Sequence, residues 1–452
     1  MNLIMLSLLV YLALILFVAW YFSRKESLET YFINKRKTSL WLLTFSNVAT
    51  IIGAGATVAV VSEIYNSGIS YGFALPLSLV IGAVVIGIMA KKIKQAGDKY
   101  KAYTIVDFFG KRFDRKNKIL VGISQIFLLI IWIAVQAIAI ASLTSVLTGL
   151  EYNIALILAG FITILYTTMG GLKIDIITDF IQFWVMFIMF ALITILGYIQ
   201  IGGINNLLTQ LPKGHLNPFA FGGISWFLGV IFLSGFLFLG NTTHWQRIFS
   251  AKNERTARNS FFFSIPFMIL FGLFIVFMGL AAVVLLPAGM KQEYAIFYLM
   301  NKILPSQLLI GVGYAAILAT IMSSIDSLLI GGSTIIYKAI ARKKKTVIKR
   351  DIVYARLITL LFGLLAFGLA FIIPNIITLS LFVSYFALIF VPPIFAAFFS
   401  KRVSANASFY SILIPTIILF ALFSVIGKNI FVITVFVGVL IIIFYDKIFR
   451  KR

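Results

Sequence analysis

The sequence predicts an all-α integral membrane protein. Hydrophobic residues make up 61% of the 452-residue chain, charged residues only 12%, and the mean hydropathy is +1.06. A soluble protein of this length needs far more polar surface. Apolar segments of about 20 residues recur along the whole chain, and each is long enough to cross the roughly 30 Å hydrocarbon core of a lipid bilayer. No stretch resembles a soluble domain or a low-complexity linker, so we predict one polytopic membrane domain.

The apolar segments give the predicted transmembrane helices in order. They are residues 2–23, 39–67, 71–93, 118–148, 152–169, 176–200, 222–245, 259–287, 306–338, 353–373, 375–399, 405–427 and 429–446. We therefore expect about thirteen transmembrane helices. The first segment is followed by Arg24 and Lys25 and lacks a small-residue cleavage site, which favours a signal anchor with the N-terminus outside.

The net charge of +24 is explained by the positions of the basic residues. If the N-terminus is outside and the segments alternate, 34 of the 38 Lys and Arg fall in cytoplasmic loops, in agreement with the positive-inside rule. This arrangement predicts a multi-pass protein of the plasma (inner) membrane with a cytoplasmic C-terminus. It leaves no basic surface for nucleic acid, and the sequence shows no obligate protein partner. It also places His244 and Arg247 at a cytoplasmic boundary.

Two predicted helices are interrupted in mid-membrane. The second segment contains "SNVATIIGAGATVAV" (46–60), and the seventh contains "SGFLFLGNTTHWQR" (234–247). The two lie five segments apart. In secondary transporters, interrupted helices at matching positions of two halves mark the binding site of an inverted repeat. The alternative is that the glycines only allow close helix packing.

A third segment carries hydroxyls in the middle of an apolar run. In "ATIMSSIDSLLIGGST" (319–334), Thr320, Ser323, Ser324 and Ser327 fall near one helical face, with Asp326 at its edge. An isolated Ser or Thr usually bonds back to its own helix. Four hydroxyls beside a carboxylate, without His or Cys, instead favour a site for a hard, non-redox cation. Carbonyls freed at the first break can contribute to a site for a monovalent ion.

Three motifs carry a resemblance to a known family. "YTTMGGLKIDIITDFIQ" (166–182), "HWQRIFSAKNERTAR" (244–258) and "ATIMSSIDSLLIGGSTIIYKAI" (319–340) resemble conserved blocks of the sodium:solute symporter family. The resemblance covers roughly residues 30 to 400 and implies a leucine-transporter-type 5+5 inverted repeat. The units it implies are 1–38, an N-terminal transmembrane helix and the first cytoplasmic loop; 39–200, the first repeat (helices 2–6); 201–400, the second repeat (helices 7–11); and 401–452, two C-terminal helices.

The resemblance also implies a main sodium site. Its ligands are the carbonyls of Ala49, Ile52 and Thr320 and the hydroxyls of Ser323 and Ser324. Thr320 replaces the usual Ala, but its ligand atom is a carbonyl, so the site is expected to survive.

Some family members resemble this chain in a second sodium site, which maps onto Asp179, Asp326 and Ser327. We expect no basic partner for the two acids at their depth. Asp179 can instead cap the start of its helix. Asp326 can instead pair with a basic loop residue or be a buried, protonated acid.

The solute site implied by the resemblance lies between the two breaks and the fourth and eleventh segments. Its candidate residues are Gly53, Gly55, Ala56, Gln136, Ser234, Phe238, Asn241 and Tyr385. Proline-type members carry an acid where this chain has Ile51, and the amides and charges of sugar-type members are not found here, so neither solute is assigned.

The predicted function is a sodium-coupled symporter that imports a small organic solute (amino acid, sugar, carboxylate or similar) by alternating access, with Na⁺ as the only metal. The alternative is a proton-coupled carrier of the same fold using Asp179 and Asp326. An enzyme is not expected, because two His and no Cys supply no nucleophile, acid–base pair or metal triad at one depth.

Overall fold

A computed structural model describes residues 3–23, 27–340, 349–372, 375–400 and 402–449. In this part of the chain the secondary structure is helical, apart from one parallel bridge between Thr38 and Ala251. The longer helices are α1 (Leu3–Phe22), α3 (Leu40–Ile51), α4 (Val58–Ser67), α5 (Ile69–Tyr100), α7 (Arg115–Thr148), α8 (Tyr152–Met169), α9 (Leu172–Ile201), α11 (Gly223–Leu233), α13 (Thr242–Ser250), α14 (Glu254–Leu285), α16 (Gln307–Ile340), α17 (Lys349–Ile372), α18 (Ile376–Leu388), α19 (Val391–Phe399), α20 (Ala405–Ile426) and α21 (Ile430–Phe449). The predicted all-α membrane fold is confirmed.

Each predicted segment corresponds to one helix or to a succession of shorter helices. Eleven stretches of the described chain are long and apolar enough to cross a membrane, and one of them, Ala405–Phe449, contains both α20 and α21. The segment 39–67 is divided into α3 and α4, neither of which is long enough alone. The number of thirteen crossings and the boundaries of the repeats stay predictions.

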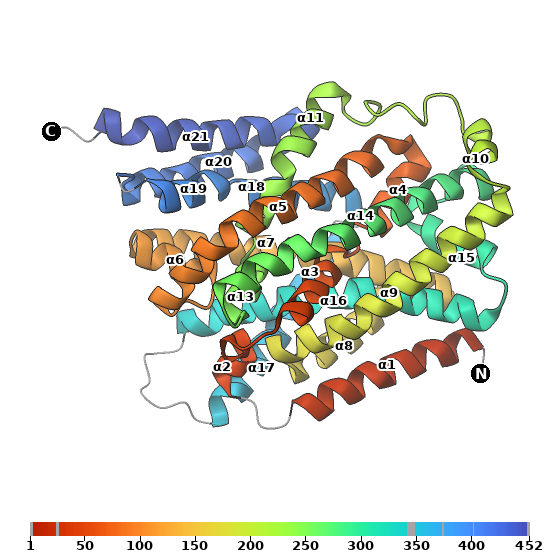
Figure 1. Cartoon of the computed structure of the whole chain (residues 1–452), viewed down its shortest axis with the longest axis horizontal. Coiled ribbons are helices and arrows are strands. Elements are labelled where there is room, and N and C mark those ends of the chain that lie inside the picture. The colour runs from red at the N-terminus through yellow and green to blue at the C-terminus, as the bar shows by residue number, and fades with distance from the viewer. Residues whose placement is uncertain (1–2, 24–26, 341–348, 373–374, 401, 450–452) are drawn as a thin grey trace.

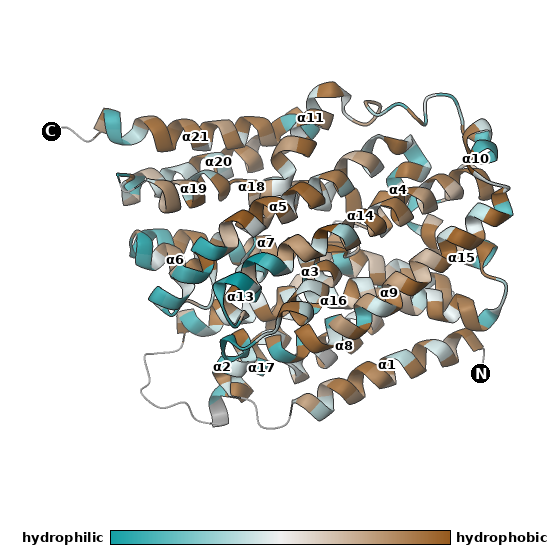
Figure 2. Cartoon of the chain, in the orientation of Figure 1, coloured by the Kyte–Doolittle hydropathy of each residue, from teal (hydrophilic) through white to brown (hydrophobic). Residues whose placement is uncertain are grey.

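Short helices that the hydropathy pattern did not predict lie at the two ends of the bundle. They are α2 (Leu28–Ile33), α6 (Ile105–Arg112), α10 (Ile204–Gln210) and α15 (Ala295–Ile303). Figure 1 shows α2 and α6 at one end and α10 and α15 at the other. Hydrophilic residues gather around α2, α6 and α13, while the long helices between the ends are mostly hydrophobic (Figure 2). Residues 342–345 and 450–452, which belong to the predicted basic cytoplasmic segments, lie outside the described residues.

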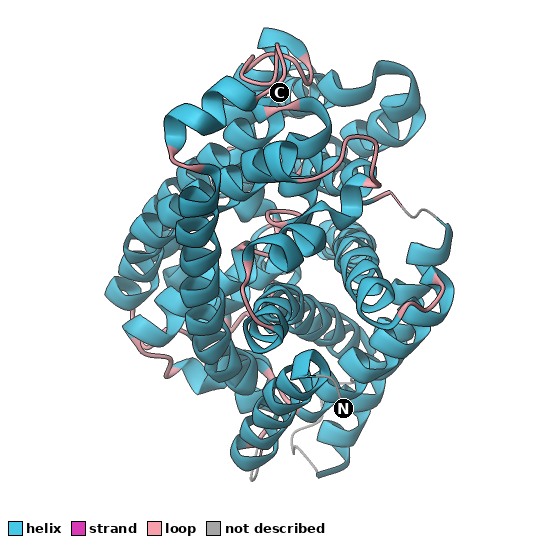
Figure 3. Ribbon diagram, turned by 90° about the vertical axis from the view of Figure 1, so that its right-hand side faces the viewer, coloured by secondary structure: helices cyan, strands magenta, loops and turns pink. Residues whose placement is uncertain are grey.

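The helices pack as one bundle, which Figure 3 shows from its end. Helix α1 lies along one edge, and the α20–α21 hairpin lies along the opposite edge (Figure 1). Helices α7 and α16 are the most enclosed, with 78% of their most apolar stretch buried, against 22% for Ala405–Phe449. The hydroxyl stripe therefore faces protein rather than lipid.

The two predicted breaks are confirmed. Helix α3 ends at Ile51 and α4 begins at Val58, with Gly53 and Gly55 between them. Helix α11 continues through the 3-10 turn η2 (Ser234–Phe236) into α12 (Leu237–Gly240), and the extended residue Asn241 separates α12 from α13.

One glycine contact shows how closely the second broken helix approaches α5. A Cβ at Gly82 of α5 would lie 2.6 Å from the carbonyl oxygen of Gly235 in η2. Small residues allow such close backbone packing in membrane proteins. This contact fixes the broken helix against the bundle.

Candidate functional site

The end of α3 is tied to α16 through its free carbonyls. The last carbonyls of a helix lack partners within the helix. Here Ser323 Oγ donates to the carbonyl of Ala49 at 2.9 Å, and Ser324 Oγ donates to that of Thr50 at 3.0 Å. Ala49, Ser323 and Ser324 are buried, and Thr50 is partly buried. The serines of the stripe therefore face the first break.

Four of the five residues predicted for the main sodium site meet here. The carbonyl of Thr320 accepts from Ser323 at 3.1 Å and from Ser324 at 3.3 Å, while its own hydroxyl bonds Ile317. Ala49 joins them through Ser323. Hydroxyl and carbonyl oxygens gathered at a helix break have the chemistry of a site for a hard monovalent cation.

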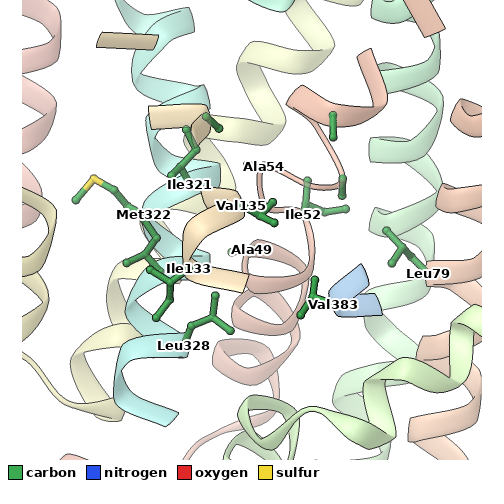
Figure 4. Close-up of a cluster of buried hydrophobic side chains, with 14 of the residues drawn as sticks. Ala49, Ile52, Ala54, Leu79, Ile133, Val135, Ile321, Met322, Leu328 and Val383 are labelled. Carbon is green, nitrogen blue, oxygen red and sulfur yellow. The ribbon is translucent and has the colours of Figure 1, made fainter. Parts of the chain in front are cut away.

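Ile52, the fifth residue, caps α3 and begins the non-helical connection, with its N–H bonded to the carbonyl of Val48 at 2.9 Å. Figure 4 shows Ile52 and Ala54 on this connection, within a buried hydrophobic cluster that includes Val135 of α7. The cluster keeps the connection away from lipid, which is the condition under which broken helices are tolerated in a membrane.

All eight residues predicted for the solute site line one cavity. The cavity lies between both broken helices, α7 and α18, and encloses about 890 Å³ of empty space, part of it open. These residues are Gly53, Gly55, Ala56, Gln136, Ser234, Phe238, Asn241 and Tyr385. The structure thus brings together residues that lie up to 332 positions apart in the sequence.

Sequence reasoning missed most of the aromatic and hydroxyl lining of this cavity. The missed residues include Tyr71, Trp132, Trp226, Thr243, His244, Ser380 and Ser384. Trp132 stands one helical turn before Gln136, a spacing that places both on one face and could have identified it. The other residues lie on helix faces that carry no sequence signal, and only the packing of the helices turns these faces toward the cavity.

His244, predicted to anchor one end of its segment at a cytoplasmic boundary, faces the interior of the protein. Its side chain is buried, lines the cavity, and its ring centroid lies 4.7 Å from that of Phe238. The sequence located a break within residues 234–247 but did not give the direction of the chain after it. The break at Asn241 turns the chain, so α13 begins beside the cavity.

Two glutamines of α7 hold both broken helices. Oε1 of Gln136 accepts from the N–H of Ala54 in the first break at 2.8 Å. Gln125 bridges the second break, because its Nε2 donates to the carbonyl of Gly240 at 2.6 Å and its Oε1 accepts from the N–H of Thr242 at 3.1 Å. The two glutamines are eleven positions apart, about three helical turns, and so share a face of α7. They satisfy backbone groups that a buried break leaves unpaired.

Asn241 fixes the start of α13. Its Oδ1 accepts from the backbone N–H and the hydroxyl of Thr243, both at 3.0 Å. This is the usual arrangement of an N-cap, in which a side-chain oxygen replaces the missing helical acceptor. The amide nitrogen of Asn241 has no hydrogen bond to any described residue and remains on the cavity side.

A buried ion cluster lies beside the proposed sodium site. Arg247 is 1% exposed, and its Nη2 lies 3.0 Å from Oδ2 of Asp175, 2.9 Å from Oδ2 of Asp179 and 2.6 Å from Oγ of Ser327. Its Nε donates to Ser46 at 3.0 Å. The expectation that the two predicted acids lack a basic partner is therefore wrong for Asp179. The sequence placed Arg247 in a loop, and the break at Asn241 brings it inside.

Asp179 and Ser327 meet in this cluster. Oδ2 of Asp179 also accepts hydrogen bonds from the hydroxyls of Ser46 at 2.6 Å and Thr50 at 3.3 Å. The hydroxyl oxygens of Thr50 and Ser327 lie 3.3 Å apart. The other oxygen of Asp179, Oδ1, is buried without a hydrogen bond to a described residue. Asp179 does not cap its helix, because α9 begins seven residues earlier, at Leu172.

Asp326 is directed differently. It accepts a short hydrogen bond from Thr167 of α8, and it shares a small cavity with Asp175. Asp175, which the sequence analysis did not single out, is a member of the Arg247 cluster and also faces the small cavity that Asp326 lines. Its position one turn before Asp179 on α9 was the available signal.

Aromatic side chains around Trp226 join the cavity to the C-terminal hairpin. Nε1 of Trp226 donates to the hydroxyl of Tyr385 at 3.1 Å, and that hydroxyl donates to the carbonyl of Lys428 at 2.8 Å. Nζ of Lys428 donates to the carbonyl of Phe221 at 2.7 Å. This chain of contacts fixes Tyr385 as a wall of the cavity.

The chain is similar in sequence and in fold to known transporters. A sodium/proline symporter of Staphylococcus aureus is 28% identical over 379 residues, which cover 79% of this chain and 73% of that protein. The structure is similar to a Na⁺-coupled sialic acid symporter in a substrate-bound, outward-open state, with a TM-score of 0.85, 19% identity and coverage of 99% and 98% of the two chains. It also resembles Mhp1, a nucleobase-cation-symport-1 family transporter in a closed conformation with bromovinylhydantoin bound, with a TM-score of 0.57, 13% identity and coverage of 92% and 94%.

The leucine-transporter-type fold is shared with these transporters, as the sequence predicted. The model of the sodium:solute symporter family matches residues 31–415, which is most of the chain. This protein therefore belongs to the sodium:solute symporter family.

Proposed function

We propose that this protein is a sodium-coupled symporter that imports a small organic solute by alternating access. The observation that carries the proposal is the position of Ser324. Its hydroxyl bonds the carbonyl of Thr50 in the predicted sodium site, and the same residue lines the cavity between the broken helices. An ion at this site and a solute in the cavity would share a wall.

Coupling follows from this shared wall. An ion held by Ala49, Thr320, Ser323 and Ser324 would fasten α16 to the end of α3, one of the two helices whose break forms the cavity. Sodium must bind the conformations of the protein unequally, because equal affinity shifts no equilibrium. Fastening α16 to α3 favours the conformation in which the cavity is assembled.

The solute is proposed as a class only. The similar Staphylococcus aureus protein is named for proline, and the similar structure for sialic acid. Ile51 lines the cavity of this chain at the position where proline-type members carry an acid. This difference argues against assigning proline as the solute of this protein.

The protein is proposed to lie in the plasma membrane with its N-terminus outside and its C-terminus inside.

A second sodium ion at Asp179 and Ser327 is part of the proposal. The cluster holds two carboxylates, Asp175 and Asp179, against one guanidinium, Arg247, and an oxygen of Asp179 has no partner among the described residues. A buried excess of negative charge favours binding of a cation or a proton. Arg247 bonds both Asp179 and Ser327, so it must move for an ion to bind there. The sialic acid symporter has a novel Na⁺ site.

Asp326, the third predicted member of this second site, bonds Thr167 of α8 and not Asp179. Its participation would require that its carboxylate exchange the hydrogen bond with Thr167 for the ion. We therefore propose Asp179 and Ser327, rather than Asp326, as the main ligands of the second ion.

Solute counterflow tests the proposed function. Liposomes that contain the purified protein are loaded in turn with amino acids, sugars, monocarboxylates and vitamins, and entry of the labelled solute is measured with sodium or with choline. We expect exchange of one solute class that requires sodium on both sides. Exchange that continues in choline and follows a pH gradient would replace sodium by protons, with Asp179 and Asp326 as the carriers of charge.

A further inference from the structure

The two amides that face the cavity have their orientation fixed by the backbone. Oε1 of Gln136 accepts from the N–H of Ala54, and Oδ1 of Asn241 accepts from the N–H of Thr243. A backbone N–H can only donate, so each amide must direct its oxygen to the chain and cannot be flipped. Each therefore offers only its NH₂ group to the cavity.

These NH₂ groups have no other use within the described protein. The structure gives neither Nε2 of Gln136 nor Nδ2 of Asn241 a hydrogen bond to a described residue, although both residues line the cavity and are almost fully buried. Both nitrogens are open to the cavity, where they remain available as hydrogen-bond donors. A solute that brings hydrogen-bond acceptors to both amides can use these donors.

The residues around the cavity indicate whether the hydrogen-bond acceptor on the solute is neutral or charged. None of the described residues that line the cavity is Asp, Glu, Lys or Arg. Outside the lining, the guanidinium of Arg247 is already paired with Asp175 and Asp179, so the proposed sodium ion supplies the positive charge for the solute. A Cβ at Gly53 would lie 2.2 Å from Oγ of Ser324 and 2.9 Å from Nε2 of Gln136, so the amide and the sodium site adjoin at this glycine. An anionic acceptor placed there is balanced by the ion, and this balance makes sodium and solute bind together.

We infer that the solute carries a carboxylate, which lies at Gly53 beside the sodium ion and accepts hydrogen bonds from Gln136 and from Asn241 across the cavity. The rest of the solute contacts the aromatic wall formed by Trp132, Trp226 and Phe238, and the hydroxyls of Ser380 and Ser384 lie in the same lining. No acidic side chain lines the cavity, so an ammonium group on the solute is not required. This inference depends on the proposed function, since the sodium ion supplies the positive charge.

The first test uses matched solutes on the purified wild-type protein. Melting temperatures are measured in sodium and in choline with short-chain and aromatic monocarboxylates, and with the carboxamide and the alcohol of each. We expect one or more acids to raise the melting temperature in sodium only, with no effect of the matched carboxamide or alcohol. A carboxamide or alcohol that stabilises as well as its acid, or a series in which no acid stabilises, overturns the inference.

The second test uses two variants that keep the fold-supporting acceptor and remove only the donor. Gln136→Glu retains an oxygen for Ala54, and Asn241→Asp retains the N-cap for Thr243. Each replaces an NH₂ group with an oxygen that repels a carboxylate. We expect each to weaken binding of the acid about tenfold or more, and we expect Gln136→Glu to favour the carboxamide. Asn259→Asp on α14 makes the same charge change outside the cavity and should bind the acid as the wild type does.

A measurement with sodium and no solute distinguishes failure of this inference from failure of the proposed function. We expect sodium without solute to stabilise the wild type and both variants. If sodium stabilises and the variants still bind the acid with wild-type affinity, the carboxylate site is wrong and the symporter proposal stands. If sodium has no effect on any of the proteins, the sodium-coupled function itself fails.

Discussion

The Nη2 nitrogen of Arg247 lies 2.9 Å from Oδ2 of Asp179, and both side chains are almost completely buried. The same nitrogen also pairs with Asp175 at 3.0 Å. Arg247 comes from α13, the second half of a broken helix, and both acids come from α9, the last helix of the predicted first repeat. The ion cluster thus connects the two predicted repeats beside the proposed sodium site.

Removal of the guanidinium is expected to destabilise the protein. Arg247→Gln leaves two buried carboxylates without a positive partner, and breaking such a pair typically costs about 3–5 kcal/mol of the free energy of unfolding. The melting temperature of the detergent-purified variant should fall clearly. The double variant Arg247→Gln/Asp179→Asn should recover part of the loss, because one charge is removed with its partner.

Arg258→Gln is the matched control for this experiment. Arg258 lies exposed at the start of α14, where its Nε bonds Asn259. It should melt as the wild type does, because exposed charges contribute little. Equal melting temperatures for Arg247→Gln and Arg258→Gln would contradict a structural role of the buried cluster.

The serines of α16 are expected to determine sodium affinity. Ser323→Ala and Ser324→Ala each remove one proposed ligand, so each should weaken sodium binding by about 1–2 kcal/mol. Solute affinity at fixed sodium should fall as well, because coupling between two ligands is reciprocal. Sodium titrations followed by the melting temperature measure the first effect, and solute binding at two sodium concentrations measures the second.

Ser333→Ala provides the comparison on the same helix. Ser333 is buried, but its hydroxyl bonds only the carbonyl of Ile330 in its own helix. Its sodium dependence should be that of the wild type. Wild-type sodium dependence in Ser323→Ala and Ser324→Ala as well would place the ion elsewhere.

Two glycines of the first break are expected to respond differently to the same substitution. A Cβ at Gly53 would overlap Ser324 and crowd Gln136, whereas a Cβ at Gly55 would meet its nearest atom at 3.5 Å, an ordinary contact. Overpacking of this kind costs about 1–3 kcal/mol. Gly53→Ala should therefore lose both sodium and solute affinity, while Gly55→Ala keeps sodium affinity. Similar sodium titrations for the two variants would show that the break does not hold the site in this geometry.

The acids of the ion cluster are expected to control the sodium stoichiometry. With two ions per solute, the sodium dependence of transport has a Hill coefficient above one. Asp179→Asn should lower it toward one, because Asp179 lies in the cluster with Ser327. Asp326→Asn should keep it, because Asp326 bonds Thr167. A wild-type coefficient of one, or a loss of cooperativity in Asp326→Asn alone, would remove Asp179 from a second site.

The membrane orientation can be tested with single cysteines, because the chain has none of its own. Lys213→Cys lies in the exposed connection between α10 and α11, and Lys116→Cys lies at the exposed start of α7. A membrane-impermeant maleimide on intact cells should label the first and not the second until the cells are permeabilised. The reverse pattern would place the N-terminus inside.

Composition and pattern by themselves determined the class of this protein. Long apolar runs exclude a soluble fold, because a bilayer requires backbone groups to be satisfied within helices. Both breaks and the hydroxyl stripe of α16 could be located in the sequence, since Gly, Asn and Ser interrupt an otherwise apolar pattern. The resemblance to a family then placed eight distant residues around one cavity, and the structure brings all eight together.

Tertiary structure alone decided which polar groups meet. A hydropathy pattern gives the depth of a residue only if its helix is straight, and the break at Asn241 moved His244 and Arg247 from a predicted boundary into the protein. The pairing of Asp326 with Thr167, and of Gln125 and Gln136 with the two breaks, depends on contacts between helices far apart in the chain. Such contacts leave no periodic signal in the sequence, because any buried polar residue shows the same local pattern whichever partner packing brings to it.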